Sequence, residues 1–279
     1  MSTEKHDNEL ALFDQPEIEI ATQKKEWITV RPINQLTEGA AIEFNVPGTS
    51  RTYIDLKNLL LKVKLQVIKA DGSNLEPTAK VGLTNNALHS IFSQVDVNIQ
   101  QQPTSEVGAN YAYKAYLDTL LQCQSQHDLD CQLFIKDESG IDMDDTDPAC
   151  RNNGLVMRSI YTSQSKQLDL IGRLHVDVCQ QDRLIVNGVP INIKLWQNSD
   201  RFRILSKDDA ESYKVRITEA ALNVASVKVN PDVIVGQNDV IKTSSTLYPY
   251  NRSVIMTYAV PRGQLPTTYF KAKYPSSSS

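Results

Sequence analysis

The stretch that decides the fold is residues 166–205, KQLDLIGRLHVDVCQQDRLIVNGVPINIKLWQNSDRFRIL. Its first half alternates apolar and polar residues, a period of two that is typical of a strand with one buried face. The apolar positions are Leu168, Leu170, Leu174, Val176 and Val178, and the polar positions between them are Asp169, Arg173, His175 and Asp177. This alternation predicts one long strand.

A turn signal then divides the stretch. Asn187-Gly188 follows the alternating pair Leu184 and Val186, and a new alternation begins at Ile191 and continues through Ile193 and Leu195. Because Asn and Gly accept a positive φ at little cost, this dipeptide is a strong hairpin signal. We therefore expect two long strands around a short turn, with Gly188 setting the strand register.

Working outward, the rest of the chain also predicts strands. The longest apolar run places Leu59, Leu61, Val63, Leu65 and Val67 on one face. Strands are predicted within residues 26–33, 40–46, 53–74, 94–100, 214–231 and 253–263, and a slip of phase near Leu222 predicts a bulge. With about eight or nine strands and no βαβ alternation, the pattern indicates an all-β antiparallel sandwich, of which the jelly roll is one form.

One helix interrupts this pattern. Residues 110–124, NYAYKAYLDTLLQCQ, begin at Asn110, a residue type that caps helices well. Its apolar residues follow helical spacing and predict a packing face made of Tyr113, Tyr116, Leu117, Leu120 and Leu121. We expect one short helical insertion that covers an end of a sheet. Residues 81–93 are expected to hold either a further short helix or an extended crossing.

The totals exclude several classes of protein. The chain has 279 residues with 29 Lys+Arg against 33 Asp+Glu, so no strongly basic nucleic-acid surface is indicated. Cys123, Cys131, Cys150 and Cys179 show no CxxC spacing and no signal peptide precedes them, so free thiols in an intracellular chain are expected. No apolar run reaches bilayer length, so we expect a soluble protein without a membrane partner.

Residues that could carry chemistry are few, and the phosphate-binding, nucleophile-elbow and zinc-protease motifs are absent. His175 and Cys179 are four residues apart, which on a strand is about 13 Å and too far for one metal ion. His89 is expected to be a buried, hydrogen-bonded histidine, and Asp182-Arg183 a salt-bridged turn. We assign no catalytic, cofactor-binding or metal residue, and expect no enzyme and no cofactor.

An acidic loop occupies residues 137–153, DESGIDMDDTDPACRNN. Its aspartates could bind a hard cation through oxygen. The EF-hand pattern fails, however, because Asp147 stands where that loop needs glycine and Asn153 where it needs glutamate. A solvated acidic surface loop is the favoured interpretation, with calcium binding as the alternative.

Several ordered blocks resemble the double jelly-roll major capsid protein (hexon) family of polinton/Maverick elements and adintoviruses. The blocks are IEFNVPGTSRTYIDLKNLLLKVKLQVIKADG, LHSIFSQVDVNIQ, NYAYKAYLDTLL and the part of the opening stretch from Leu168 to Leu205. The resemblance runs from about Glu26 to about Gln264. It implies a flexible N-terminal arm at residues 1–25, a first jelly roll at 26–232, and a linker with the truncated start of a second roll at 233–279.

The resemblance also implies a function. In that family the chains self-associate into trimeric capsomers that tile a shell around double-stranded DNA, so we expect a virus- or transposon-derived structural capsid-type protein. Its partners would be copies of itself, once a second roll is supplied, and other capsid proteins, without sequence-specific nucleic-acid binding. It would lie in a virion if viral and otherwise in the cytoplasm or nucleus. The alternative is a ligand- or carbohydrate-binding β-sandwich module.

Overall fold

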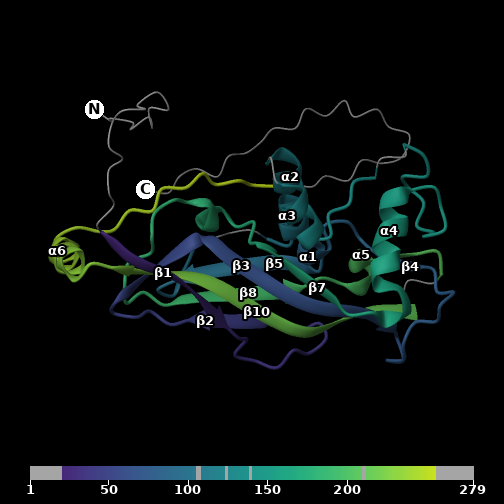
Figure 1. Cartoon of the computed structure of the whole chain (residues 1–279), viewed down its shortest axis with the longest axis horizontal. Helices are drawn as coiled ribbons and strands as arrows, with labels where there is room; N and C mark the ends of the chain where they lie inside the picture. The colour runs from purple at the N-terminus through teal and green to yellow at the C-terminus, as the bar shows by residue number, and fades with distance from the viewer. Residues whose placement is uncertain (1–20, 105–107, 123–124, 138–139, 209–211, 256–279) are drawn as a thin grey trace.

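The computed structural model describes residues 21–104, 108–122, 125–137, 140–208 and 212–255. Two four-stranded antiparallel sheets pack face to face (Figure 1). The first has the order β1 (Thr22–Val30), β10 (Tyr213–Val229), β3 (Thr52–Lys69), β7 (Leu168–Arg173), and the second the order β2 (Ile42–Val46), β8 (Ile191–Gln197), β5 (Phe92–Ile99), β6 (Gln102–Pro103). A short pair, β4 (Val81–Leu83) and β9 (Ile204–Ser206), extends one end.

The strand pairing is nested. With the short pair set aside, the first strand pairs with the last, the second with the next to last, and so on inward to β5 with β6. Pairing of β10 with β3 and of β8 with β5 closes the two sheets. A long antiparallel ribbon wrapped around a core gives this order, which is that of a jelly roll.

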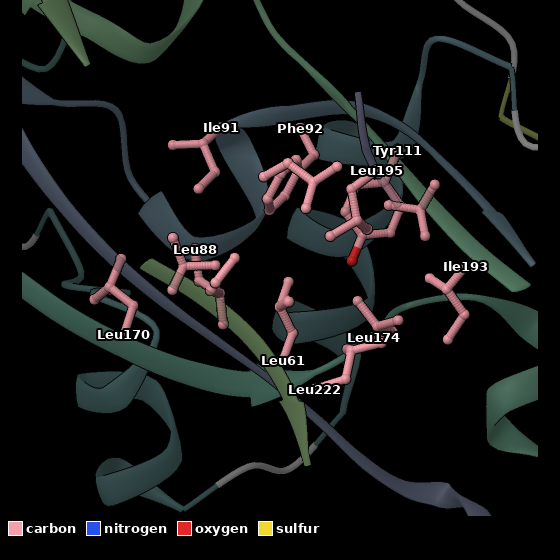
Figure 2. Packing of buried hydrophobic residues seen from close by; sticks show 14 of the residues in the cluster. Leu61, Leu88, Ile91, Phe92, Tyr111, Leu170, Leu174, Ile193, Leu195 and Leu222 are labelled. Carbon is pink, nitrogen blue, oxygen red and sulfur yellow. The ribbon is translucent and has the colours of Figure 1, made fainter. Parts of the chain in front are cut away.

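The core lies between the sheets and follows the predicted alternation. Leu59, Leu61, Val63, Leu65 and Val67 of β3 are all buried, which confirms the predicted inner face of this strand. Figure 2 shows side chains of both sheets in one cluster, which also includes Tyr111. The predicted bulge in β10 is confirmed by register shifts between Ile217 and Glu219 and between Asn223 and Ala225. Such bulges bend a long strand, which lets one sheet curve around the core.

The predicted hairpin around Asn187-Gly188 is wrong. Strand β7 ends at Arg173, a 3₁₀ helix occupies Asp177–Gln180, and β7 and β8 lie in different sheets. Residues 174–178 are buried at the polar as well as the apolar positions, because this crossing passes beneath a layer of helices. The alternation therefore predicted a strand longer than β7. The segment that links β7 to β8 crosses from the first sheet to the second.

Gly188 nevertheless has the positive φ that the turn signal predicted, at +78°. Its N–H donates to the Thr49 carbonyl oxygen at 2.8 Å, and Asn187 Nδ2 donates to the Ser50 carbonyl oxygen at 2.9 Å. A Cβ atom added to Gly48 would lie 2.4 Å from the Gly188 carbonyl carbon. Two distant turns, one after β2 and one before β8, are therefore packed backbone to backbone.

The prediction of one helical insertion is also wrong, because several helices are present. They are α1 (Ala87–Ser90), α2 (Tyr111–Leu121), α3 (Gln126–Cys131), α4 (Asn153–Thr162), α5 (Asp200–Arg203) and α6 (Pro231–Ile241). The short helix allowed for in residues 81–93 is confirmed as α1. The start of α6 carries a readable signal, since the Asn230 side chain accepts from Asp232 N–H and Pro231 occupies the first turn.

Three of the four cysteines fall in the described residues, and all three are free thiols, as expected; Cys123 lies outside them. In that same part of the chain, no helix combines the length and apolar character needed to cross a membrane. Strand β1 starts at Thr22, four residues before the expected boundary of the first roll at residue 26.

We predict that Gly188→Val lowers the free energy of unfolding by about 1–2 kcal/mol, because a β-branched residue is strained at positive φ. Urea denaturation of the variant and the wild type measures this difference. Gly236→Ala is the control: this glycine lies in α6 with no neighbour close to the added Cβ, so the variant should be as stable as the wild type or slightly more stable. Equal midpoints for Gly188→Val and the wild type would contradict the role of the turn.

Candidate functional site

The densest group of titratable side chains lies beneath α2. The inner face of this helix presents Tyr111, Lys114, Ala115 and Asp118, which follow helical spacing. They meet α1 and the crossing that follows β7, so residues far apart in the sequence share one buried site. We refer to Lys114, Asp118, Asp177, His175, His89 and Tyr111 as the buried network.

Lys114 is the centre of this network and its side chain is only 2% exposed. Its Nζ lies 2.7 Å from Asp118 Oδ2 and 3.0 Å from Asp177 Oδ1. Burial by itself would lower the pKa of Lys114, but the two carboxylates outweigh it and the pKa is raised. Burial likewise opposes ionisation of Asp118, yet His175 and Lys114 lower the pKa of its carboxyl. The network therefore holds its charges as compensated pairs.

Two histidines complete the network. His89 is fully buried, with Nδ1 3.0 Å from Tyr111 Oη and Nε2 3.0 Å from Gln132 Oε1. Because the Gln132 amide oxygen can only accept, His89 Nε2 donates to it, and Nδ1 of the neutral ring accepts from the Tyr111 hydroxyl, which itself accepts from the backbone N–H of His175. The two imidazole rings pack edge to face at 4.6 Å between centroids. The prediction that His89 is a buried, hydrogen-bonded histidine is confirmed.

Burial lowers the reactivity of His89, Tyr111 and the neighbouring Cys179. Burial, with the neighbouring His175 as a second cause, holds the pKa of His89 well below its ordinary value, so its imidazole is neutral at pH 7. Burial raises the pKa of Tyr111, and burial together with Asp177 raises the pKa of the Cys179 thiol to about 12. A thiol with that pKa is protonated at neutral pH and is a poor nucleophile.

The network also anchors a strap, residues 247–255, which has no regular secondary structure. Asp177 Oδ2 accepts from the Ser253 N–H at 2.8 Å, so the partner of Lys114 also binds the strap backbone. Further side-chain bonds hold the strap, among them one from Tyr250 Oη to the Thr104 carbonyl oxygen and one from Asn110 Nδ2 to the Ile255 carbonyl oxygen. Figure 1 shows this yellow-green segment running from α6 to α2.

The sequence did not predict the network, and it misplaced His175, a member, and the neighbouring Cys179. His175 and Cys179 do not lie on a strand facing outward, because β7 ends before them and both are buried. A cleft of about 710 Å³ lies beside them, lined also by His127 and Cys131. His127 Nε2 lies 3.7 Å from Cys131 Sγ, but no three His, Cys, Asp or Glu side chains gather at metal-binding distance within the described ranges.

Two other predicted features also differ in the structure. Asp144 and Asp145 of the acidic loop are exposed as predicted, but Asp147 is buried and its carboxylate binds Lys80 and Lys207, each at 3.2 Å. A hydrogen bond from the Ala149 N–H and these two lysines lower the pKa of Asp147 to about 2, although burial opposes the shift. Asp182 and Arg183 do not pair with each other: Asp182 binds Lys57, and Arg183 donates to the Leu247 carbonyl oxygen.

The predicted packing face of α2 points outward. Its apolar residues are partly exposed, from Tyr116 at 37% to Leu121 at 82%, while the other face of the helix is buried. Asn110 stands at the N-cap position but its side chain makes no capping bond and binds Ile255 instead. The sequence therefore identified the helix correctly and assigned the wrong face to the core.

The aromatic residues that a carbohydrate site would need are dispersed. Trp27 lies on β1, Trp196 on β8, and Tyr248 and Tyr250 on the strap. Trp196 Nε1 donates to Asp96, and its ring carries Lys194 Nζ at 4.5 Å from the centroid. Tyr248 Oη accepts from the Val186 N–H. These four side chains come from three separate segments, and Trp196, Tyr248 and Tyr250 already make contacts within the protein.

Comparisons with known proteins give one relative and several similar structures. No protein-family model matches the sequence. A curated relative, the Caenorhabditis elegans "Uncharacterized protein F54H12.2", is 23% identical over 217 residues, which cover 73% of this chain and 49% of that protein. The chain therefore spans about half the length of this relative.

Among solved structures, the chain is similar to PBCV-1 VP54, with 8% identity, a TM-score of 0.49, and coverage of 80% of this chain and 46% of that one. It is also similar to the mavirus major capsid protein (17%, 0.40, 80% and 50%) and the Faustovirus major capsid protein (10%, 0.45, 84% and 59%). All these TM-scores lie below 0.5, so the similarities do not by themselves establish the fold. The jelly-roll fold is assigned from the strand order of this structure.

We predict that Lys114→Met lowers the free energy of unfolding by about 3–5 kcal/mol, because it leaves two neighbouring carboxylates, one of them buried, without their cation. Chemical denaturation measures the loss. Lys242→Met is the matched control, since its ion pair with Asp239 is exposed, and it should change stability by no more than about 0.5 kcal/mol. Similar losses of unfolding free energy in the two variants would show that the buried ion pairs of Lys114 stabilise the fold no more than an exposed ion pair does.

The buried network also predicts a pH dependence. Below pH 6.5 the unfolded chain gains a proton that folded His89 does not, so the free energy of unfolding falls as the pH falls, by about 1.4 kcal/mol per unit. From pH 7 to pH 5 this amounts to about 2 kcal/mol, measurable by urea titrations at both values. His89→Gln should reduce the slope, whereas His127→Gln, at an exposed site, should retain it. Equal slopes in wild type and His89→Gln would contradict this assignment.

Proposed function

We propose that this chain is a capsid-type structural protein whose jelly roll self-associates into capsomers. The observation that carries the proposal is the nested order of eight strands in two facing sheets. Viral capsid domains use this architecture, but so do lectins and cupins, so the fold alone does not choose among them. The interior, the buried network and the surface of the roll favour the capsid-type function.

The interior of the roll favours a structural role. A cupin needs a ligand or metal site inside its barrel, whereas here the inward side chains of both sheets fill the space between them. Phe44, Leu61, Val95 and Ile193, which come from four strands of the two sheets, have no solvent exposure and belong to one apolar cluster. Shape and stability are what such an interior provides.

The buried network points the same way. Its lysine is held by two carboxylates, and its His89 is neutral with both nitrogens bonded. The neighbouring Cys179 thiol is protonated at neutral pH. These groups lock the helices and the strap to the roll. Because Lys114, Asp177 and His89 are occupied by one another, by Gln132 and by the strap, the network is best explained as a structural clamp.

The surface offers apolar side chains for contact with other subunits. Trp27 and Ile28 are exposed on β1, which is an edge strand, and Met157, Ile160 and Tyr161 are exposed on α4. Apolar side chains grouped on exposed elements often mark contacts between proteins. The balanced charge of the chain agrees with assembly through shape and apolar contact more than through binding of nucleic acid.

A narrower proposal is membership of the double jelly-roll capsid proteins of polinton/Maverick elements and adintoviruses. It is supported by the resembling blocks, which correspond to structured elements of the roll, among them β3, β5, α2 and β8. In this proposal residues 26–232 are the first roll, residues 233–279 lead toward a second roll, and trimeric capsomers form when both rolls are present. Other capsid proteins would then be partners, and the protein would lie in a virion.

We predict that the purified chain forms discrete oligomers in size-exclusion chromatography with light scattering, between about 1 and 100 μM. Negative-stain microscopy should then show particles of uniform size. Because the contacts are proposed to be apolar, the oligomers should persist at about 1 M salt, where charge-driven aggregates dissociate. A chain that remains monomeric at the highest concentration contradicts self-assembly and leaves only the fold.

A further inference from the structure

The outer face of α2 has two apolar rows but no cover among the described residues. Tyr113, Leu117 and Leu121 form one row at a spacing of four, and Tyr116 and Leu120 form a second row beside it. Leu120 is 53% exposed and Leu121 82%, whereas a surface helix normally presents polar residues to water. We call these five side chains the α2 outer face. Their exposure is costly in water, which indicates that something covers them.

Aromatic rings of neighbouring elements contact only the two tyrosines of the α2 outer face. The Tyr113 ring packs edge to face on Phe202, with centroids 5.7 Å apart, and the Tyr116 ring tilts against Phe134 at 5.5 Å. Both tyrosines are therefore held in place, while Leu120 and Leu121 are more exposed than either tyrosine. The helix cannot rotate to bury them, because its opposite face is fixed by Lys114 in the buried network.

The strap ends beside the N-terminal end of α2. Asn110, the residue before α2, donates from Nδ2 to the carbonyl oxygen of Ile255 at 3.2 Å. Two residues earlier, the Ser253 N–H is bound to Asp177, which itself pairs with Lys114 of α2. The last described residue, Ile255, therefore lies at the N-terminal end of α2.

The sequence that follows has the composition to cover the α2 outer face. Residues 256–273, MTYAVPRGQLPTTYFKAK, contain three basic residues, no acidic residue, and the apolar residues Met256, Tyr258, Val260, Leu265, Tyr269 and Phe270. Beyond the C-terminal end of α2, α3 exposes Asp128 and Asp130. An extended chain of this length reaches about 55 Å, and α2 is only about 16 Å long. The length and apolar content of this segment match the α2 outer face, and its positive charge matches the aspartates of α3.

We propose that residues 256–273 bind the outer face of α2 within the same chain, with apolar side chains on the two rows and basic side chains toward α3. In this proposal the strap holds the chain that precedes this segment beside α2. The inference does not depend on the capsid proposal, because a monomeric chain could make the same contact.

Site-specific photocrosslinking of the full chain tests the contact. Benzoylphenylalanine at Leu117 should give an adduct of monomer mass whose crosslinked peptide, identified by mass spectrometry, lies within residues 256–273. The same probe at Val235, an exposed apolar position of α6, should not label that segment. A dimer-mass adduct would show that a second copy covers the face, and either that result or an adduct elsewhere in the chain overturns the proposal.

Limited proteolysis provides a second test that needs no probe. If the segment is bound, trypsin should cut slowly after Arg262, and Leu117→Asp combined with Leu121→Asp should increase that rate at least tenfold. Both leucines are exposed, so the double variant should melt as the wild type does. Asn238→Asp, at an exposed position of α6, should leave the rate unchanged. Equal cleavage rates in the double variant and the wild type contradict the proposed contact.

Discussion

The rest of the structure depends on the long antiparallel pairing of β3 with β10, which runs from Lys69 opposite Tyr213 to Thr52 opposite Lys228. These two strands are the middle of the first sheet, so β1 and β7 are positioned by pairing with them. Their inward side chains are the floor on which the second sheet packs. Because a slip of one residue would turn every side chain to the opposite face, the buried rows of β3 fix this register.

A second constraint holds the helices to this framework. Lys114 is buried where a lysine is tolerated only with compensating charge, and the two aspartates that compensate it come from α2 itself and from the crossing after β7. One of them, Asp177, also binds the strap at Ser253. A single buried cation thus joins the roll, the helical insertion and the C-terminal part of the described chain.

These two constraints support the structural function that we propose. The core is filled, Lys114 is compensated by two carboxylates, His89 is neutral, and the Cys179 thiol is protonated. What remains available lies on the surface: an edge strand with exposed Trp27 and two helices with outward apolar rows. A protein that works through contact between subunits needs a rigid body with such surfaces, and a jelly roll supplies one.

The sequence by itself determined the features that depend on local pattern: the inner face of β3, the bulge in β10, the existence of α2 and the positive φ of Gly188. Only the tertiary structure decided which strands pair and which helix face is buried. Alternation records that a residue is inward but not against which partner, so β7 and β8 were wrongly joined in a hairpin. Hydrophobic spacing also assigned the wrong face of α2 to the core. The buried face contains Lys114, and the aspartate that pairs with it, Asp177, lies 63 residues away along the chain, so local spacing does not reveal it.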